Sequence, residues 1–306
     1  MAEPADSSQW TDTGPATAGV GGVFVPEELS SDLIGRIICK AAVTNLARHW
    51  PMKRLTLKIP KISAGITADW VDAMAVKPKS KVEFGYKVLT AEKLAVIVPF
   101  EDQLLEDADR DVAGIVRSDI TDAMAEAMDQ TFLGYSATSP FADSVSGNTP
   151  AGHSVAYGTG VDLAADANTA MGAIEEHGYV PTGWVCHQRI KSYLRGLRDA
   201  NNNPIFVPSL TSDAPDTLYG LPIYYTCNAQ ASGSPGTYEL LVADWRHVFI
   251  GDKRSLEITR ATEATVTLSG TAINLWERDM TAIRAVLRVA FGINENNALA
   301  KVTTIP

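Results

Sequence analysis

The residues with most potential for catalysis or metal binding are five histidines and three cysteines, and their spacing supports neither role. The histidines show no ligand spacing and no HExxH pattern, so we expect structural roles for His49, His153, His177, His187 and His247. The cysteines are too few and too scattered for a disulfide framework or a CxxC metal site, and we expect buried thiols at Cys39, Cys186 and Cys227. The sequence therefore predicts no metal and no cofactor.

Cys186 stands next to His187, which suggests a nucleophile with its base. Neighbouring side chains on a strand point to opposite faces, however, and a catalytic dyad needs side chains that converge. GxSxG, a Walker phosphate loop and a strand-linked GxGxxG are also missing from the sequence. We therefore expect no catalytic residues and no enzyme. An α+β enzyme stays open as an alternative, to be revived by any turnover that is lost when Cys186 or His187 is changed.

The strongest structural signal is an amphipathic helix predicted over residues 99–134. Apolar residues recur there at spacings of three and four, Pro99 closes the strand-like run before it, and Gly134 stands at a C-terminal cap position. Its polar side carries ten acids against two arginines: Glu101, Asp102, Glu106, Asp107, Asp109, Asp111, Asp119, Asp122, Glu126 and Asp129. Such a surface suits either a divalent cation or a basic partner, and we favour solvated or partner-facing carboxylates.

Residues 51–98 have the opposite charge and a different period. Alternation of apolar and polar residues predicts two long strands joined through a tip rich in small residues, hence a long β-hairpin. Its net charge is about plus five, whereas the whole chain carries minus ten. Lys77, Lys79 and Lys81 share one face of the extended tip, and two roles are open for them: solvated surface lysines or a subunit contact.

The composition fits a globular protein of 306 residues that can bury a sizeable core. A pI near 5.0 argues against electrostatic wrapping of nucleic acid. We see neither a signal peptide nor an apolar run long enough for a membrane helix, and expect a cytoplasm-like compartment. Residues 1–25 are expected to form an arm, followed by a helix that opens at Pro26 and ends near Arg48.

The second half of the sequence predicts an α+β domain. We expect helices at 162–177 and 187–198, and strands at 183–186, 219–227 and 238–245. The segment 248–260 is predicted to turn at Gly251 and Asp252 into a further strand, and the last part is predicted to end as a strand pair through Ala300 to Val302.

This order of parts resembles the major capsid proteins of tailed bacteriophages, which have the Hong Kong 97-type fold. The resemblance covers nearly the whole chain from about residue 23. It rests on FEDQLLEDADRDVAGIVRSDITDAMAEAMDQTFLG, WVCHQRIKSYLRGLRDANNNPIF, YGLPIYYT, VADWRHVFIGDKRSLEITR and WERDMTAIRAVLRVAFGI. Each motif is weak alone, and their order over 280 residues is fairly specific.

The resemblance implies an α+β Hong Kong 97-like capsid fold with four parts. These are an N-terminal arm and short helix (1–50), an extended loop (51–98), a peripheral domain with a spine helix (99–160 and 251–306) and an axial domain (161–250). The membership of the last strand, in the peripheral or the axial domain, is left open.

The resemblance also implies a function: a major capsid protein that assembles through hexamers and pentamers into an icosahedral shell around double-stranded DNA. The alternative is the shell protein of an encapsulin-like bacterial nanocompartment, which has the same fold. Expected partners are copies of the same chain, portal, scaffolding and decoration proteins, and packaged DNA without specific binding; no membrane is expected. The expected location is the virion, after assembly in the host cytoplasm.

In such shells the extended loop lies over a neighbouring subunit, which accounts for the segregated charge. We therefore expect an intersubunit contact between a basic hairpin and an acidic helix, through Lys77, Lys79, Lys81, Glu101, Asp102, Glu106, Asp107, Asp109 and Asp111.

Overall fold

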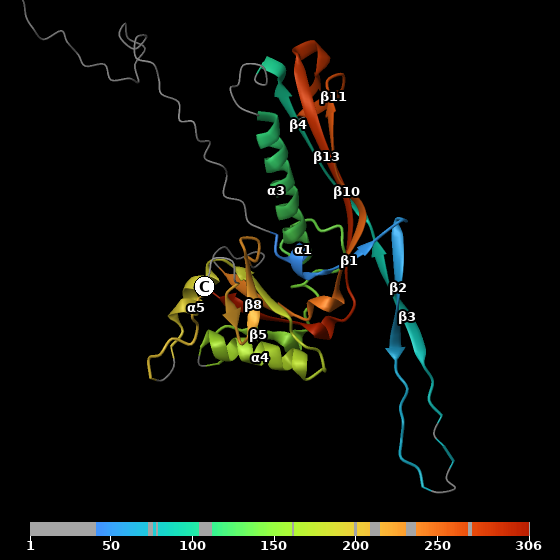
Figure 1. Cartoon of the computed structure of the whole chain (residues 1–306), viewed down its shortest axis with the longest axis vertical. Coiled ribbons are helices and arrows are strands. Elements are labelled where there is room, and N and C mark those ends of the chain that lie inside the picture. The colour runs from blue at the N-terminus through green and yellow to red at the C-terminus, as the bar shows by residue number, and fades with distance from the viewer. Residues whose placement is uncertain are drawn as a thin grey trace, which may run out of the picture. The chain divides into compact units, whose positions relative to one another are not determined.

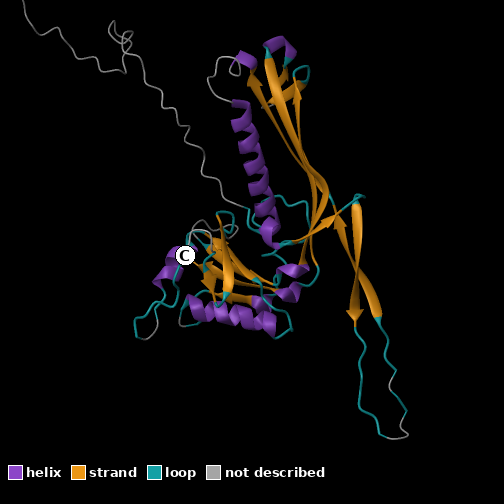
Figure 2. Cartoon of the chain, viewed as in Figure 1, coloured by secondary structure: helices purple, strands orange, loops and turns teal. Residues whose placement is uncertain are grey.

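The computed structural model describes residues 41–72, 76–77, 79–103, 112–160, 162–198, 201–208, 215–230, 237–268 and 271–305. Helices and strands are mixed along the chain (Figures 1 and 2). The helices are α1 (Val43–Leu46), α3 (Val112–Leu133), α4 (Leu163–Glu175) and α5 (Ile190–Gly196), with 3-10 turns at Ala151–His153, Trp245–His247, Trp276–Arg278 and Asn296–Ala298. The arm and most of the helix expected at 26–48 lie outside the described residues.

A four-stranded sheet in the order β1-β10-β13-β4 carries the long helix α3. Its strands are β1 (Arg48–Pro51), β4 (Glu92–Glu101), β10 (Val248–Ala261) and β13 (Met280–Ile293). Ile120 and Met124 of α3 are buried against Ile283 and Ala285 of β13. One stripe of the helix is therefore buried on the sheet, as the apolar spacing predicts.

Two predictions about this sheet are wrong. Pro99 does not close a strand: it pairs with Ala282 inside β4, which is tolerated because β4 is an edge strand. The predicted helix therefore does not begin at residue 99: Asp102 and Gln103 are helical, and α3 is described from Val112. The turn expected at Gly251 and Asp252 is also wrong, since both residues lie within β10, where a Cβ at Gly251 would collide with Met52. The pairing of β10 with β13 shifts register directly after Asp252, so the strand is irregular at this point but does not turn.

The basic hairpin is a two-stranded antiparallel sheet of β2 (Thr56–Ala64) and β3 (Glu83–Thr90). It is shorter than expected, because residues 92–101 form β4 in the four-stranded sheet. A further two-stranded sheet joins β11 (Thr265–Leu268) to β12 (Thr271–Asn274). Figure 1 shows this small sheet next to β10 and β13.

A six-stranded sheet in the order β5-β14-β9-β6-β8-β7 forms the other main layer. Its strands are β5 (Ser154–Ala156), β6 (Gly183–His187), β7 (Thr217–Leu218), β8 (Leu221–Thr226), β9 (Tyr238–Ala243) and β14 (Leu299–Ile305). The strands and helices expected between 162 and 245 are thus present, with α4 capped at its N-terminus by the Asp162 side chain. The last strand pairs with β9 and β5 in this sheet.

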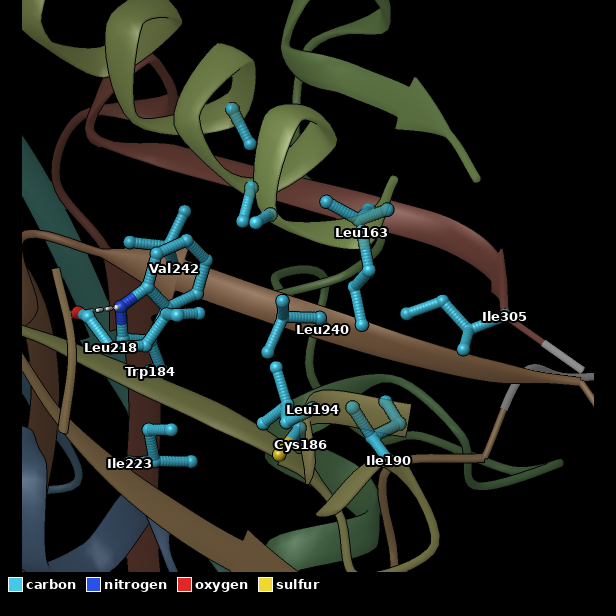
Figure 3. Packing of buried hydrophobic residues seen from close by; sticks show 14 of the residues in the cluster. Leu163, Trp184, Cys186, Ile190, Leu194, Leu218, Ile223, Leu240, Val242 and Ile305 are labelled. Carbon is cyan, nitrogen blue, oxygen red and sulfur yellow. Dashed lines mark hydrogen bonds between the residues drawn. The ribbon is translucent and has the colours of Figure 1, made fainter. Parts of the chain in front are cut away.

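The six-stranded sheet is buried on both faces. Trp184, Cys186, Leu240 and Val242 face the helices α4 and α5 in one core (Figure 3). Within this core the Trp184 indole Nε1 donates to the Leu218 carbonyl at 3.1 Å. The alternate residues, such as Val185 and Leu241, belong to a second core with α1, the end of α3 and β13. Burial on both faces explains why β6 reads as a continuous apolar run.

Candidate assembly surfaces

The three lysines predicted for a subunit contact are exposed near the tip of the hairpin. Lys77, Lys79 and Lys81 lie in the connection between β2 and β3, Lys81 two residues before β3 begins. Lys81 Nζ lies 3.8 Å from the Glu83 carboxylate, and both side chains are more than half exposed. An ion pair between side chains so exposed contributes little to the stability of the fold. The lysines are thus available to a partner.

The acidic half of the predicted contact is only partly described. Glu101 is exposed at the end of β4. Asp102 already has partners within its own chain, because it accepts a hydrogen bond from the Thr281 hydroxyl and lies 3.8 Å from Arg260 Nη2. The other four lie outside the described residues: Glu106, Asp107, Asp109 and Asp111. The structure does not bring these acids and the tip lysines together within one chain, among the residues that it describes.

The paired strands β2 and β3, which form the root of the hairpin, are fixed to the chain by two ion pairs. Lys61 Nζ lies 3.1 Å from the Glu295 carboxylate, and Lys87 Nζ lies 2.5 Å from that of Asp143. Asp143 also accepts the backbone N–H of Ile293 at 3.1 Å. All four side chains are at most one-third exposed, so these pairs hold the hairpin in place better than surface pairs would.

Asp129 does not belong to the acidic surface on which the sequence placed it. Its side chain is fully buried. One carboxylate oxygen accepts the backbone N–H groups of Ala42 and Val43 at 3.1 and 2.9 Å, and the other accepts the Thr226 hydroxyl at 2.8 Å. Asp129 therefore joins α3 to α1 and to β8.

Burial raises the pKa of Asp129, while the hydrogen bonds from Val43, Thr226 and Ala42 act against that shift. Sequence reasoning missed this role, although a signal was present. Asp129 lies three and four residues before Phe132 and Leu133, on the stripe that the spacing assigns to the core.

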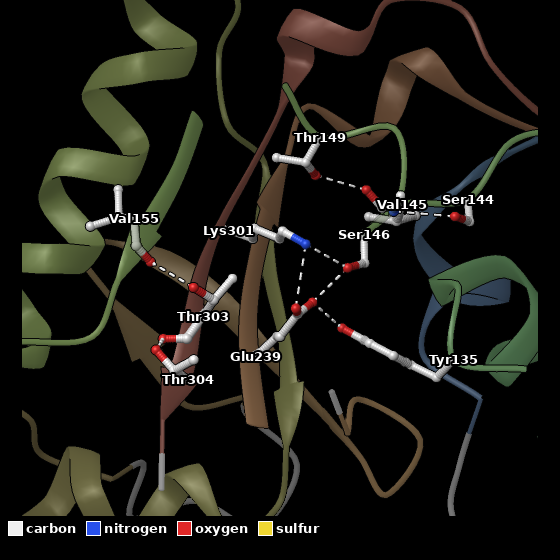
Figure 4. Close-up of polar contacts among 11 residues, drawn as sticks. Tyr135, Ser144, Val145, Ser146, Thr149, Val155, Glu239, Lys301, Thr303 and Thr304 are labelled. Carbon is white, nitrogen blue, oxygen red and sulfur yellow. Dashed lines mark hydrogen bonds and ion pairs between the residues drawn. The ribbon is translucent and has the colours of Figure 1, made fainter. Parts of the chain in front are cut away.

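A second buried polar cluster joins β9, β14 and the segment after α3 (Figure 4). The Glu239 carboxylate accepts the hydroxyl groups of Tyr135 and Ser146, each at 2.6 Å, and pairs with Lys301 Nζ at 3.3 Å. Burial, followed by the nearby charge of Glu239, raises the pKa of Tyr135 well above its ordinary value, so its hydroxyl stays a donor. Because each of these polar groups has a hydrogen-bond or ion-pair partner, the cluster is a structural network.

The pair Cys186 and His187 does not form a nucleophilic site. The Cys186 side chain is fully buried, and burial raises the pKa of its thiol, which is the reverse of what a reactive cysteine needs. Burial also lowers the pKa of His187, as does the charge of Arg189. Cys227 is in a disulfide bond and is therefore not the free thiol that we expected.

The described part of the chain contains neither a cluster of metal ligands nor a membrane-spanning helix. No group of three or more His, Cys, Asp or Glu there is placed to hold a metal ion. None of the described helices is long and apolar enough to cross a membrane. A cavity of about 640 Å³ is lined by residues of β1, β2, the segment after α4 and the turn Trp245–His247, among them Trp50, Lys61, Tyr179 and Arg246.

Nearly the whole chain matches a known protein family. The sequence model described as "Phage capsid family" matches residues 21–304. The match spans nearly the whole sequence, and the chain belongs to the phage capsid family.

Relatives and solved structures agree with this assignment. The chain is 26% identical over 302 residues to the "Major capsid protein" of Klebsiella oxytoca phage phiKO2, covering 92% of this chain and 68% of that protein. A "Probable major capsid protein gp17" of Mycobacterium phage D29 is 22% identical and is covered to 90%. A structure from Microbacterium phage Oxtober96 aligns with a TM-score of 0.77 and 29% identity, over 93% of this chain and 97% of that one.

The similarity extends to structures in which only the fold is shared. A chain titled "Capsid of native GTA particle computed with C5 symmetry" aligns with a TM-score of 0.68 at 15% identity. The fold is thus that of phage capsid proteins, Hong Kong 97-like, with mixed helices and sheets. The neighbours are phage capsids rather than encapsulins, so the nanocompartment alternative is not retained. Family membership favours a structural protein over an enzyme.

Proposed function

We propose that this chain is the major capsid protein of a tailed bacteriophage, which self-assembles through hexamers and pentamers into an icosahedral shell around double-stranded DNA. The observation that carries the proposal is the family match over residues 21–304 together with relatives that are themselves major capsid proteins. The chain's place is the virion, after assembly in the host cytoplasm. Its partners are other copies of itself and, at particular positions of the shell, portal, scaffolding and decoration proteins.

The parts of the subunit follow from the same proposal. The hairpin β2–β3 is the extended loop and α3 is the spine helix of a peripheral domain that contains β4, β10 and β13. The six-stranded sheet with α4 and α5 is the axial domain. Two elements lie in that sheet from outside the range 161–250, namely β5 and β14, so the axial domain includes both.

The intersubunit contact is proposed between the tip lysines and the acids at the start of the spine region of a neighbouring copy. Lys77, Lys79 and Lys81 are exposed and have the charge that such a contact needs. Glu101 is exposed as well. Asp102 contributes less than expected, because Thr281 and Arg260 of its own chain already bind it. The other four acids keep their proposed role: Glu106, Asp107, Asp109 and Asp111.

Charge reversal tests this contact. The triple variant Lys77→Glu, Lys79→Glu, Lys81→Glu should assemble at least about tenfold less efficiently, because three attractive contacts become repulsive at every interface. Sedimentation and negative-stain microscopy measure the yield of particles. The matched control reverses three exposed lysine or arginine residues elsewhere, Lys93, Arg195 and Arg278, and should assemble better than the tip variant. Normal particles from the tip variant would contradict the contact.

A further inference from the structure

One face of the sheet β1-β10-β13-β4 packs on the helix α3. Ile283, Ala285 and Leu287 of β13 lie on that face, together with Leu94 and Val96 of β4, and all five belong to the cluster that α3 completes. Because side chains alternate along a strand, the residues between them point to the other face of the sheet. These residues are Lys93, Ala95 and Ile97 of β4 and Arg284, Val286 and Arg288 of β13.

The cross-strand register brings three cations into one row on this second face. Arg288 of β13 pairs with Arg254 of β10 on one side and with Lys93 of β4 on the other. Side chains directly opposite each other on neighbouring strands have Cβ atoms about 5 Å apart, and like charges in such positions destabilise a sheet. The row Arg254–Arg288–Lys93 therefore concentrates three positive charges across three adjacent strands.

The chain's own acceptors satisfy only one end of this row. Glu257 of β10 lies on the same face and forms an ion pair with Arg254. Neither Arg288 nor Lys93 forms an ion pair with any described residue. The Nε of Arg288 is buried and, within the described part of the chain, has no hydrogen-bond partner. A buried donor without an acceptor is costly, so Arg288 indicates a ligand that these residues do not supply.

Further cations lie near the row. Arg284 stands two residues before Arg288 on β13, so it points to the same face, and its Nε donates to the Thr259 hydroxyl at 3.2 Å. Lys253 Nζ donates to the Lys53 carbonyl, which places Lys53 beside β10. The whole chain carries a net charge of minus ten, so this concentration of positive charge is local. It creates a potential that attracts anions.

A phosphate group fits this row better than a carboxylate does. Phosphate has acceptor oxygens in several directions, so one group can bridge cations on neighbouring strands. An arginine guanidinium binds it through two parallel N–H···O bonds. Free phosphate carries up to two negative charges, and nucleic acid presents a run of phosphates. A single carboxylate brings one charge, which Glu257 already supplies to Arg254.

We propose that Arg254 and Arg288, with the charge of Lys93 beside them, bind a phosphate group on the face of the four-stranded sheet that points away from α3. The group is free inorganic phosphate or a phosphodiester of nucleic acid. Once bound, it offsets the repulsion within the row and so stabilises the sheet. The site goes beyond the proposed function, because all of its residues belong to one chain and binding needs no assembly.

Thermal unfolding of dissociated subunits measures the binding of free phosphate. About 20 mM sodium phosphate should raise the unfolding temperature of the unmodified chain by about 2 to 4 °C over sodium chloride of the same ionic strength, because a ligand of the folded state stabilises that state. Arg288→Gln and Arg254→Gln should each lose at least half of this shift. Arg195→Gln should keep all of it, since Arg195 is exposed and lies in α5. This control also contains the general stabilisation that phosphate gives through hydration.

Fluorescence anisotropy with a short duplex DNA tests the second source of phosphate. If nucleic acid is the ligand, free phosphate should give the same shift in every variant, while the affinity for the duplex should fall at least threefold in Arg288→Gln and Arg254→Gln and stay unchanged in Arg195→Gln. Either pattern supports the site and identifies its ligand.

One result overturns the proposal: equal responses of the unmodified chain and of both row variants to free phosphate and to DNA. Arg254 is half exposed in the folded chain, so Arg254→Gln decides the outcome if Arg288→Gln does not fold.

Discussion

The buried carboxylate of Asp129 connects α3 to α1 and to β8. Its two oxygens satisfy the backbone N–H groups of Ala42 and Val43 and the hydroxyl of Thr226, which come from parts of the chain 86 or more residues away. Each of these donors would be buried without a partner if the carboxylate were removed, at a cost of about 1 to 3 kcal/mol per group. Asp129 therefore stabilises the packing of α3 against α1 and β8.

Asp129→Ala should lower the free energy of unfolding by about 2 to 4 kcal/mol, because it orphans these donors and leaves a cavity. Asp129→Asn keeps an oxygen for the two N–H groups and should cost about 1 kcal/mol or less. Urea unfolding of dissociated subunits at pH 7 measures both variants. Equal losses would contradict this account, since it gives the acceptor oxygen the main role.

The pH dependence of the same position has a definite sign. Burial raises the folded-state pKa of Asp129 above its unfolded value, so the folded chain binds the proton more tightly. The stability from this group is therefore fully present below the unfolded pKa, about 3.9, and is lost as the pH rises through the folded pKa. Relative to Asp129→Asn, the unmodified chain should gain stability from pH 7 to pH 4 in urea titrations. A difference between the two that does not vary with pH would contradict the assignment.

The contribution of His49, which lies in β1, to the stability of the chain should also depend on pH. Its Nδ1 lies 2.8 Å from the Asp252 carboxylate and its Nε2 lies 2.8 Å from the Thr44 carbonyl, so both nitrogens donate only when the ring is protonated. Burial lowers its pKa, but the hydrogen bonds to Thr44 and Asp252 and the charge of Asp252 outweigh burial, and the pKa is raised overall.

The stabilisation by His49 is fully present below the unfolded pKa, about 6.5, and is lost as the pH rises through the folded pKa. His49→Ala should thus cost more stability at pH 5.5 than at pH 9. The difference should be below about 1 kcal/mol, because both side chains are more than 40% exposed. Thermal unfolding of subunits at the two pH values measures it, and a larger cost at pH 9 would contradict the assignment.

At the scale of elements, the cluster around Glu239 joins β9 and β14 to the segment after α3 (Figure 4). Lys301→Met alone should destabilise the subunit by about 3 kcal/mol, since it leaves the Glu239 charge buried with only two hydroxyl donors. Adding Glu239→Gln removes that charge, so the double variant should lose less than the sum of the two single losses. A double-mutant cycle in urea should give a coupling of about 1 to 3 kcal/mol. Strict additivity would contradict a shared network.

The sequence predicts most elements correctly because periodicity is a local signal. The hairpin strands, α4 and β6 follow from alternation, apolar spacing and caps. What failed depended on tertiary context. Pro99 is tolerated within β4 because β4 is an edge strand. Gly251 lies within β10 without a side chain because Met52 packs closely against it. The burial of Asp129 likewise depends on α1 and β8, which no local window contains.

The proposed contact residues show the same division. Their charge segregation is readable from the sequence, whereas the partners that Asp102 has within its own chain come from β10 and β13, more than 150 residues away. The exposed apolar face of the hairpin, with Ile62, Phe84 and Tyr86, could not be predicted from the sequence. It follows from the register of β2 and β3, which determines the residues that share a face.

At the scale of the whole molecule, two exposed features among the described residues are the tip lysines and the face of the hairpin on which Ile62, Phe84 and Tyr86 are more than half exposed. Both make physical sense for a subunit that is completed by its neighbours. The family assignment supplies those neighbours, as further copies of the same chain. We propose that surface charge sets the register between subunits and that buried apolar area supplies most of the association free energy.

Electron cryomicroscopy of the expressed chain, with its phage's scaffolding protein present, tests the central claim most directly. The account predicts closed icosahedral shells whose hexamers and pentamers are built of this fold, with the tip lysines of each hairpin in contact with a neighbouring copy. Monomers or small oligomers alone, under conditions where related capsid proteins assemble, would contradict it.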